Sequence, residues 1–151
     1  MTFGKVAGDQ YLIRFEKGEE ILPSLKTFCK RYNITNATVS GIGSLENPTL
    51  AHYRVDNKKY SEKKFEGVYE VVSLLGNIAL FEKNPLPHIH VTLSDEEMHV
   101  IAGHLIQGTV SATLEMTLND LPTMHRKKHD EEIGLNLWDL PETLPAKDLS
   151  N

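Results

Sequence analysis

The chain has 151 residues, a mass of 17.0 kDa and a formal net charge of −5. A chain of this length buries about 68–70% of its unfolded surface and needs no disulfide or metal ion to fold. Hydrophobic residues make up 40% and charged residues 25%, which is ordinary globular usage and argues against disorder. The acidic balance also argues against a simple basic surface for nucleic acid.

Sequence features also bear on compartment and domain number. No stretch approaches the roughly 18 apolar residues of a membrane helix, and the N-terminus lacks the apolar core of a secretory signal. The single cysteine, Cys29, excludes an internal disulfide and a cysteine-rich zinc site. We therefore expect a cytoplasmic protein without membrane partners, with one domain over residues 1–140 and a C-terminal tail over residues 141–151.

A strand followed by a helix opens the predicted fold. Tyr11–Glu16 has the length and residue types of a strand, and Lys17-Gly18 ends it. In residues 19–31 apolar side chains recur at spacings of three and four, which predicts an amphipathic helix. Pro23 is tolerated only in the first turn of this helix. Cys29 falls on the apolar stripe, so we interpret it as a core residue.

The rest of the chain reads as short strands. The predicted strands cover residues 36–42, 50–55, 69–75, 78–81, 88–93, 100–106 and 109–118, with a lysine-rich polar stretch over 56–64. Gly76-Asn77 is predicted to form a tight turn. From Asn119 onward the apolar pattern weakens. One early helix followed by many strands predicts an α+β fold with a mainly antiparallel sheet and one principal helix near the N-terminus.

Two histidines in one predicted strand suggest a metal site. His88 and His90 are two residues apart, so their side chains share one face, about 6.6 Å apart along the strand. If the following hairpin centres on Glu96, His88 pairs with His104 and three imidazoles cluster. In this register Ala102 lies opposite His90, leaving space for a ligand, and Gly103 allows close backbone approach.

Three neutral imidazoles suit zinc, nickel, cobalt or iron, and leave a coordination position open. The simpler alternative is a set of half-buried strand histidines that backbone groups satisfy. His125 and His129 are four apart, a spacing that binds metal on a helix, but their charged surroundings favour a solvated face.

Two acidic residues interrupt apolar strands. Glu70 and Glu115 are either bases near a metal-bound water or members of structural ion pairs with Arg14, Arg54 or Arg126. We favour the structural role.

Three segments stand out when they are taken together: residues 41–50 (GIGSLENPTL), residues 65–78 (FEGVYEVVSLLGNI), and PHIHV at 87–91 combined with GHLIQG at 103–108. In this order they resemble a known family, the PPC (plants and prokaryotes conserved) domain. The resemblance covers roughly residues 11–134. It implies a homotrimer of α+β subunits in which His88, His90 and His104 hold a divalent metal ion, most commonly zinc.

The resemblance leaves the function open. In plants the domain accompanies AT-hook motifs, and bacterial members are often labelled DNA-binding by analogy. This chain has no Arg-Gly-Arg-Pro core of an AT-hook, and fold analogy alone cannot carry DNA binding across. We expect a stand-alone trimeric metal-binding module with a regulatory or DNA-associated role, with weak DNA binding at most. The alternatives are a small metal-dependent enzyme that uses the open metal position and a structural self-association module.

Overall fold

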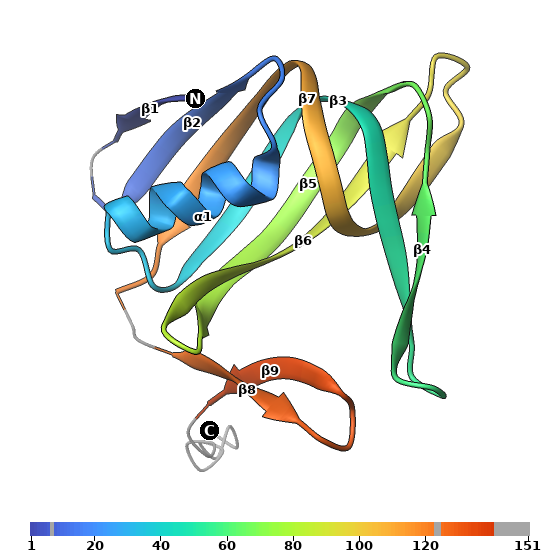
Figure 1. Cartoon of the computed structure of the whole chain (residues 1–151). Coiled ribbons are helices and arrows are strands. Elements are labelled where there is room, and N and C mark those ends of the chain that lie inside the picture. The colour runs from blue at the N-terminus through green and yellow to red at the C-terminus, as the bar shows by residue number, and fades with distance from the viewer. Residues whose placement is uncertain (7, 123–124, 141–151) are drawn as a thin grey trace, which may run out of the picture.

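The computed structural model describes residues 1–6, 8–122 and 125–140 (Figure 1). The predicted tail, residues 141–151, lies outside this part of the chain. In chain order the elements are β1 (Thr2–Lys5), β2 (Gln10–Glu16), α1 (Ile21–Arg31), β3 (Ala37–Arg54), β4 (Lys59–Lys64), β5 (Val68–Phe81), β6 (Asn84–Ser94), β7 (Val100–Asp120), β8 (Arg126–Asp130) and β9 (Leu135–Asp139).

All the strands belong to one strongly bent sheet. Its main path runs β1-β2-β7-β3-β5-β8-β9, while β4 pairs with β3, and β6 pairs with both β5 and β7. The pairings are antiparallel apart from a short parallel contact between β5 and β8, at Leu80 and Arg126. The predicted α+β fold, with a mainly antiparallel sheet and one helix near the N-terminus, is confirmed. Among the described residues no helix is long and apolar enough to cross a membrane.

Helix α1 covers one face of the sheet (Figure 1). It begins two residues later than predicted, and Pro23 lies in its first turn as expected. Leu25, Phe28 and Cys29 are buried, and they pack with inward residues of the strands, such as Phe15, into one hydrophobic core. Burial raises the pKa of the Cys29 thiol to about 12. The prediction that Cys29 is a core residue is therefore confirmed.

Several predicted short strands are parts of long, bent ones. Strand β3 joins the predicted strands 36–42 and 50–55, and β7 joins 100–106 and 109–118. Gly76-Asn77 is not a turn but lies inside β5; the turn to β6 falls at Glu82 and Lys83, both with positive φ. A Cβ atom at Gly76 would lie 2.5 Å from the carbonyl oxygen of His88, so glycine here permits close strand approach.

Two hairpins have no counterpart among the predicted elements. The lysine-rich stretch forms β4, an exposed strand that pairs with the end of β3. Strands β8 and β9 form a second hairpin, which lies at one end of the sheet in Figure 1. Strand 126–130 has no apolar residue, and strand 135–139 alternates only from Leu135 to Leu137, so neither shows the longer alternation that predicts a strand.

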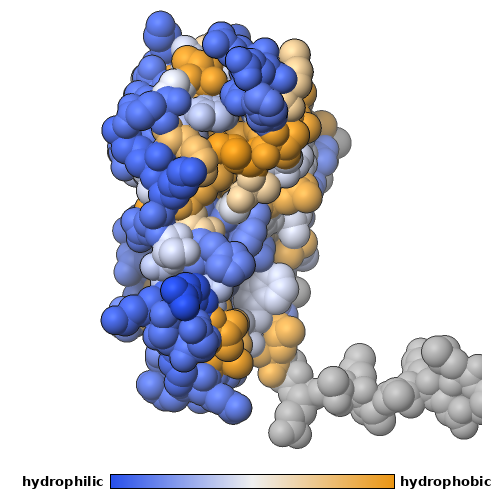
Figure 2. Space-filling view, turned by 90° about the vertical axis from the view of Figure 1, so that its right-hand side faces the viewer, coloured by the Kyte–Doolittle hydropathy of each residue, from blue (hydrophilic) through white to orange (hydrophobic). Residues whose placement is uncertain are grey.

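The face of the sheet opposite α1 carries exposed apolar side chains. Leu12, Ile42 and Leu75 are 53%, 61% and 62% exposed, and they line an open hollow of about 940 Å³. Directly paired residues share a face. One row of such pairs crosses this face through Leu12, Thr117, Ser40, Leu75, His90 and His104. On the side that carries β4, apolar residues gather beside a hydrophilic edge (Figure 2).

Candidate metal centre

The structure brings His88, His90 and His104 together on this outer face. Strand β6 carries the first two, and β7 carries the third. The observed pairs are His90 with His104 and Thr92 with Ala102. The predicted pairs of His88 with His104 and of His90 with Ala102 are therefore wrong. In the observed register the residue numbers of each pair add up to a value two higher than predicted. A shift by two preserves the face on which each side chain lies, so the three imidazoles still cluster.

The turn between β6 and β7 explains the shift in register. The carbonyl oxygen of His99 accepts a hydrogen bond from the backbone N–H of Asp95 at 3.1 Å. The Asp95 carboxylate accepts hydrogen bonds from the backbone N–H groups of Glu97 and His99, at 3.0 and 2.8 Å. Met98 has a positive φ of 66°. This five-residue turn centres on Glu97, one residue beyond the predicted centre.

The geometry of the cluster fits one metal ion. One ring nitrogen from each histidine can be chosen so that all three lie within 4.8 Å of one another. The Nε2 atoms of His88 and His90 are 3.2 Å apart. Two nitrogens at about 2.0–2.1 Å from a tetrahedral zinc ion would be about 3.3 Å apart. The imidazoles of His88 and His90 are therefore already at the spacing of two ligands of one ion.

The surroundings favour the neutral form of two of these imidazoles, those of His88 and His104. Burial lowers the pKa of His88 to about 4, and the positive charges of Lys127 and of the other two histidines, when they are protonated, add to the effect. Burial also lowers the pKa of His104, with contributions from His90 and Lys127. Neutral imidazole is the form that binds a metal ion.

His104 has a nitrogen that the protein leaves unsatisfied. Its ring stacks on Tyr60 of β4 at a centroid distance of 5.1 Å, and its Nδ1 is buried without a hydrogen-bond partner among the described residues. A buried polar atom without a partner is costly. The simpler alternative, in which backbone groups satisfy the strand histidines, does not account for this atom.

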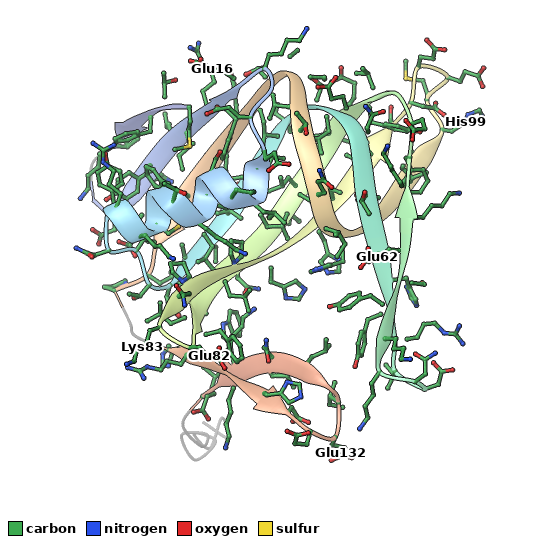
Figure 3. The ribbon with its side chains drawn as sticks, viewed as in Figure 1. Glu16, Glu62, Glu82, Lys83, His99 and Glu132 are labelled. Atoms are coloured by element: carbon green, nitrogen blue, oxygen red, sulfur yellow. The ribbon has the colours of Figure 1, made fainter. Side chains whose placement is uncertain are left out.

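The remaining histidines are not members of the cluster, although His129 lines the cavity beside His88 and His104. His52 is exposed on β3, and His99 lies at the tip of the β6–β7 turn, where it pairs with acidic residues of the same turn (Figure 3). His125 precedes β8 and His129 lies on it, so the chain between them is mostly extended and not helical. Residues four apart on a strand are about 13 Å apart, too far to share a metal ion.

Glu70 and Glu115 are both exposed, so neither acid needs a buried partner. Arg14 lies directly opposite Glu115 on the neighbouring strand, but its side chain pairs with Glu16 at 3.6 Å. Among the described residues neither acid takes part in a salt bridge, so the favoured structural ion pair is not observed. The apolar face that surrounds Glu115 is open to solvent, which sequence periodicity alone does not reveal.

Lys127 is a site residue that sequence reasoning missed. The charge of the run Arg126-Lys127-Lys128 predicts a solvated face, yet Lys127 is only 8% exposed. Burial lowers the pKa of its ammonium group. Because β8 is a strand, Arg126 and Lys128 point outward and Lys127 points inward, toward the histidines. The sequence carries no apolar neighbours that would signal this alternation.

A mainly antiparallel sheet, covered on one face by a helix and carrying three clustered histidines on the other, defines an α+β domain with a candidate metal site. Similarity to known proteins identifies its family. The model of the Plants and Prokaryotes Conserved (PCC) domain matches residues 3–122, so this chain belongs to that family, as the resemblance predicted. A search of curated proteins found no match.

Solved structures resemble more than nine tenths of this chain. A plant- and prokaryote-conserved (PPC) protein from Pyrococcus horikoshii is 35% identical, with a TM-score of 0.83 over 94% of this chain and 96% of that one. A "putative DNA binding protein" from Bacteroides thetaiotaomicron is 27% identical, with a TM-score of 0.88 over 91% and 96%. A metal-containing protein from Archaeoglobus fulgidus is 28% identical, with a TM-score of 0.81 over 91% and 98%.

Proposed function

We propose that this protein is a homotrimeric metal-binding module, with zinc held by His88, His90 and His104, and that residues 1–140 form its single domain. The observation that carries the proposal is the convergence of three ring nitrogens within 4.8 Å on one face of the sheet. The solved relative from Archaeoglobus fulgidus, described as metal-containing, supports it.

Three neutral ligands would leave a divalent ion with its full charge and with one position open for water or an exogenous group. A metal ion bound in this way supplies a Lewis acid and an acidic water molecule. The described residues that line the adjoining cavity include no aspartate or glutamate. Because a carboxylate base is missing from that wall, we favour a binding or regulatory role over the alternative of a small hydrolytic enzyme.

Elemental analysis of the purified protein tests the metal site. We expect about one zinc ion per subunit, and a sharp loss of zinc in each of the His88→Ala, His90→Ala and His104→Ala variants. His129→Ala is the matched control, because it removes an exposed histidine outside the cluster. Full zinc content in the three cluster variants would refute the assignment, and loss of zinc from His129→Ala would move the site to β8.

Self-association through the apolar outer face is the second part of the proposal. Large exposed apolar areas on one sheet face mark interaction surfaces, and the second copy of this chain is the occupant that the family resemblance implies. Light scattering should give a mass three times 17.0 kDa. Ile42→Glu, on the face, should lower that mass, whereas Val55→Glu, at an equally exposed site on the β3–β4 hairpin, should not. A monomeric wild-type protein would contradict the trimer.

DNA binding is the weaker part of the proposal. Exposed lysines on β4 are the main cationic feature, but Lys64 pairs with Glu66 at 3.0 Å, and burial of Lys127 breaks up the second basic run. A chain of net charge −5 lacks the phosphate-neutralising charge that dominates such affinity. Titration of an AT-rich duplex at near-physiological salt should show only weak, salt-sensitive binding. Nanomolar, sequence-selective binding would contradict this expectation.

A further inference from the structure

A cavity of about 410 Å³ adjoins the histidine cluster. His88 and His104 form part of its wall on one side, and the β8–β9 hairpin forms the other side with Lys127, Leu137 and Trp138. This hairpin follows residue 122, where the match to the family model ends. The cavity is therefore completed by a segment that lies outside the region shared with the family model. Its volume is in the range of small-molecule sites.

Hydrogen bonds fix the outer wall of this cavity in place. The Tyr53 hydroxyl donates to the carbonyl oxygen of Ile133 at 2.6 Å, and the Lys58 ammonium donates to the carbonyl oxygen of Glu131 at 2.8 Å. Both bonds join the β3–β4 hairpin to the turn between β8 and β9. At Gly134, in the same turn, a Cβ atom would lie 2.8 Å from the Tyr53 hydroxyl oxygen. Two hydrogen bonds from the β3–β4 hairpin thus anchor the wall.

The permanent charge on the described cavity wall is positive and comes from Lys127. Lys127 is 8% exposed, and no described acidic group lies within ion-pairing distance of its ammonium nitrogen. A buried cation that lacks an anion is costly, and a bound anion would remove that cost.

We propose that this cavity binds a small carboxylate with an apolar body. The carboxylate would lie between the metal ion at the histidine cluster and the ammonium group of Lys127, and the apolar body would pack on Leu137 and Trp138. This inference rests on the proposed metal site, which supplies the second positive charge. Apolar residues along the wall (Leu86, Pro87, Leu135, Leu137 and Trp138) favour an organic anion over an inorganic one.

Trp138 is the only tryptophan of the chain, so its fluorescence reports on the cavity directly. Zinc content is measured first, and benzoate is then titrated into the zinc-loaded protein. We expect saturable quenching or a spectral shift, and binding that is about tenfold weaker in Lys127→Met, since a charge-assisted hydrogen bond is lost. Lys128→Met, on the exposed side of the same strand, is the matched control. Benzyl alcohol, the neutral analogue of similar shape, should bind much more weakly than benzoate.

The outcomes separate the cavity from the metal site. Two results, each with normal zinc content, would overturn the carboxylate site and leave the metal site intact. One is equal benzoate affinity in wild type and Lys127→Met, and the other is a titration that does not saturate. Absence of zinc from wild type would overturn the metal site, and with it this inference. If Lys127→Met does not fold, the comparison of benzoate with benzyl alcohol on wild type decides the matter, and equal binding of the two would refute the proposal.

Discussion

The stability of the metal-free protein should fall when the pH is lowered from 6.5 to 4. His88 has a pKa of about 4 in the folded chain, whereas a histidine in the unfolded chain has a pKa of 6.5. Between these values the unfolded chain binds a proton that the folded chain does not, so protonation favours unfolding. The stability that neutral His88 gives to the folded chain is fully present above pH 6.5 and is lost as the pH falls through 4.

The size of this effect follows from the difference between the two pKa values. One pKa unit corresponds to about 1.36 kcal/mol, so the difference sets an upper limit of about 3.4 kcal/mol. His88 is only half-buried, and water screens part of the interaction. We therefore expect His88 to contribute about 1.5 kcal/mol to the loss of unfolding free energy over this range.

Urea denaturation of chelator-treated protein at pH 7 and pH 4.5 measures the effect. Replacement of His88 by Asn removes the titrating group, so the variant should lose about 1.5 kcal/mol less than wild type on acidification. His129→Gln removes an exposed histidine and should keep the wild-type pH dependence. An identical loss in wild type and His88→Asn would refute the reasoning, because burial of His88 would then have no energetic consequence.

Two further predictions concern the core. Cys29 should resist a thiol reagent at pH 8 in the native state and react with one equivalent in urea. The thiolate is the reactive form, and the pKa of the Cys29 thiol in the native state is about 12. Rapid labelling of the native protein would contradict this expectation. Gly43→Ala should destabilise the fold by about 3 kcal/mol in urea titration, since its Cβ would meet the carbonyl oxygen of Thr113 and lie 2.6 Å from the Leu114 Cα. Gly4→Ala, where a Cβ has open space, should stay within about 1 kcal/mol of wild type, and equal stability of the two variants would count against the close packing of β3 on β7.

The fold class and the metal candidates could be predicted because both rest on local periodicity. Residues two apart on a strand share a face in any register, so the pairing of His88 with His90 needed only the assignment of a strand. The placement of His104 also needed a hairpin register that puts its side chain on the same face as His88 and His90. The predicted face was correct, although the turn centres on Glu97 and not on Glu96. The expected close approach at Gly103 is also observed, because a Cβ atom there would lie 3.1 Å from the carbonyl oxygen of Ala51.

Features set by long-range packing could not be read from the sequence. Gly76 looks like a turn residue, yet it lies inside β5 because the neighbouring strand comes too close for a side chain. Lys127 sits in a charged run, and only the docking of the β8–β9 hairpin beside the histidines turns it inward. Glu115 interrupts an apolar strand without being buried, because the face of the sheet opposite α1 is itself apolar and exposed.

Anomalous diffraction at the zinc absorption edge tests the central claim most directly. Crystals of the protein purified without chelators should show one strong peak per subunit between the imidazoles of His88, His90 and His104, with zinc–nitrogen distances of about 2.0–2.1 Å. The fourth coordination position should face the cavity that Lys127 and Trp138 line. The absence of a peak in zinc-supplemented crystals, or a peak at His125 or His129 instead, would contradict the proposed metal centre.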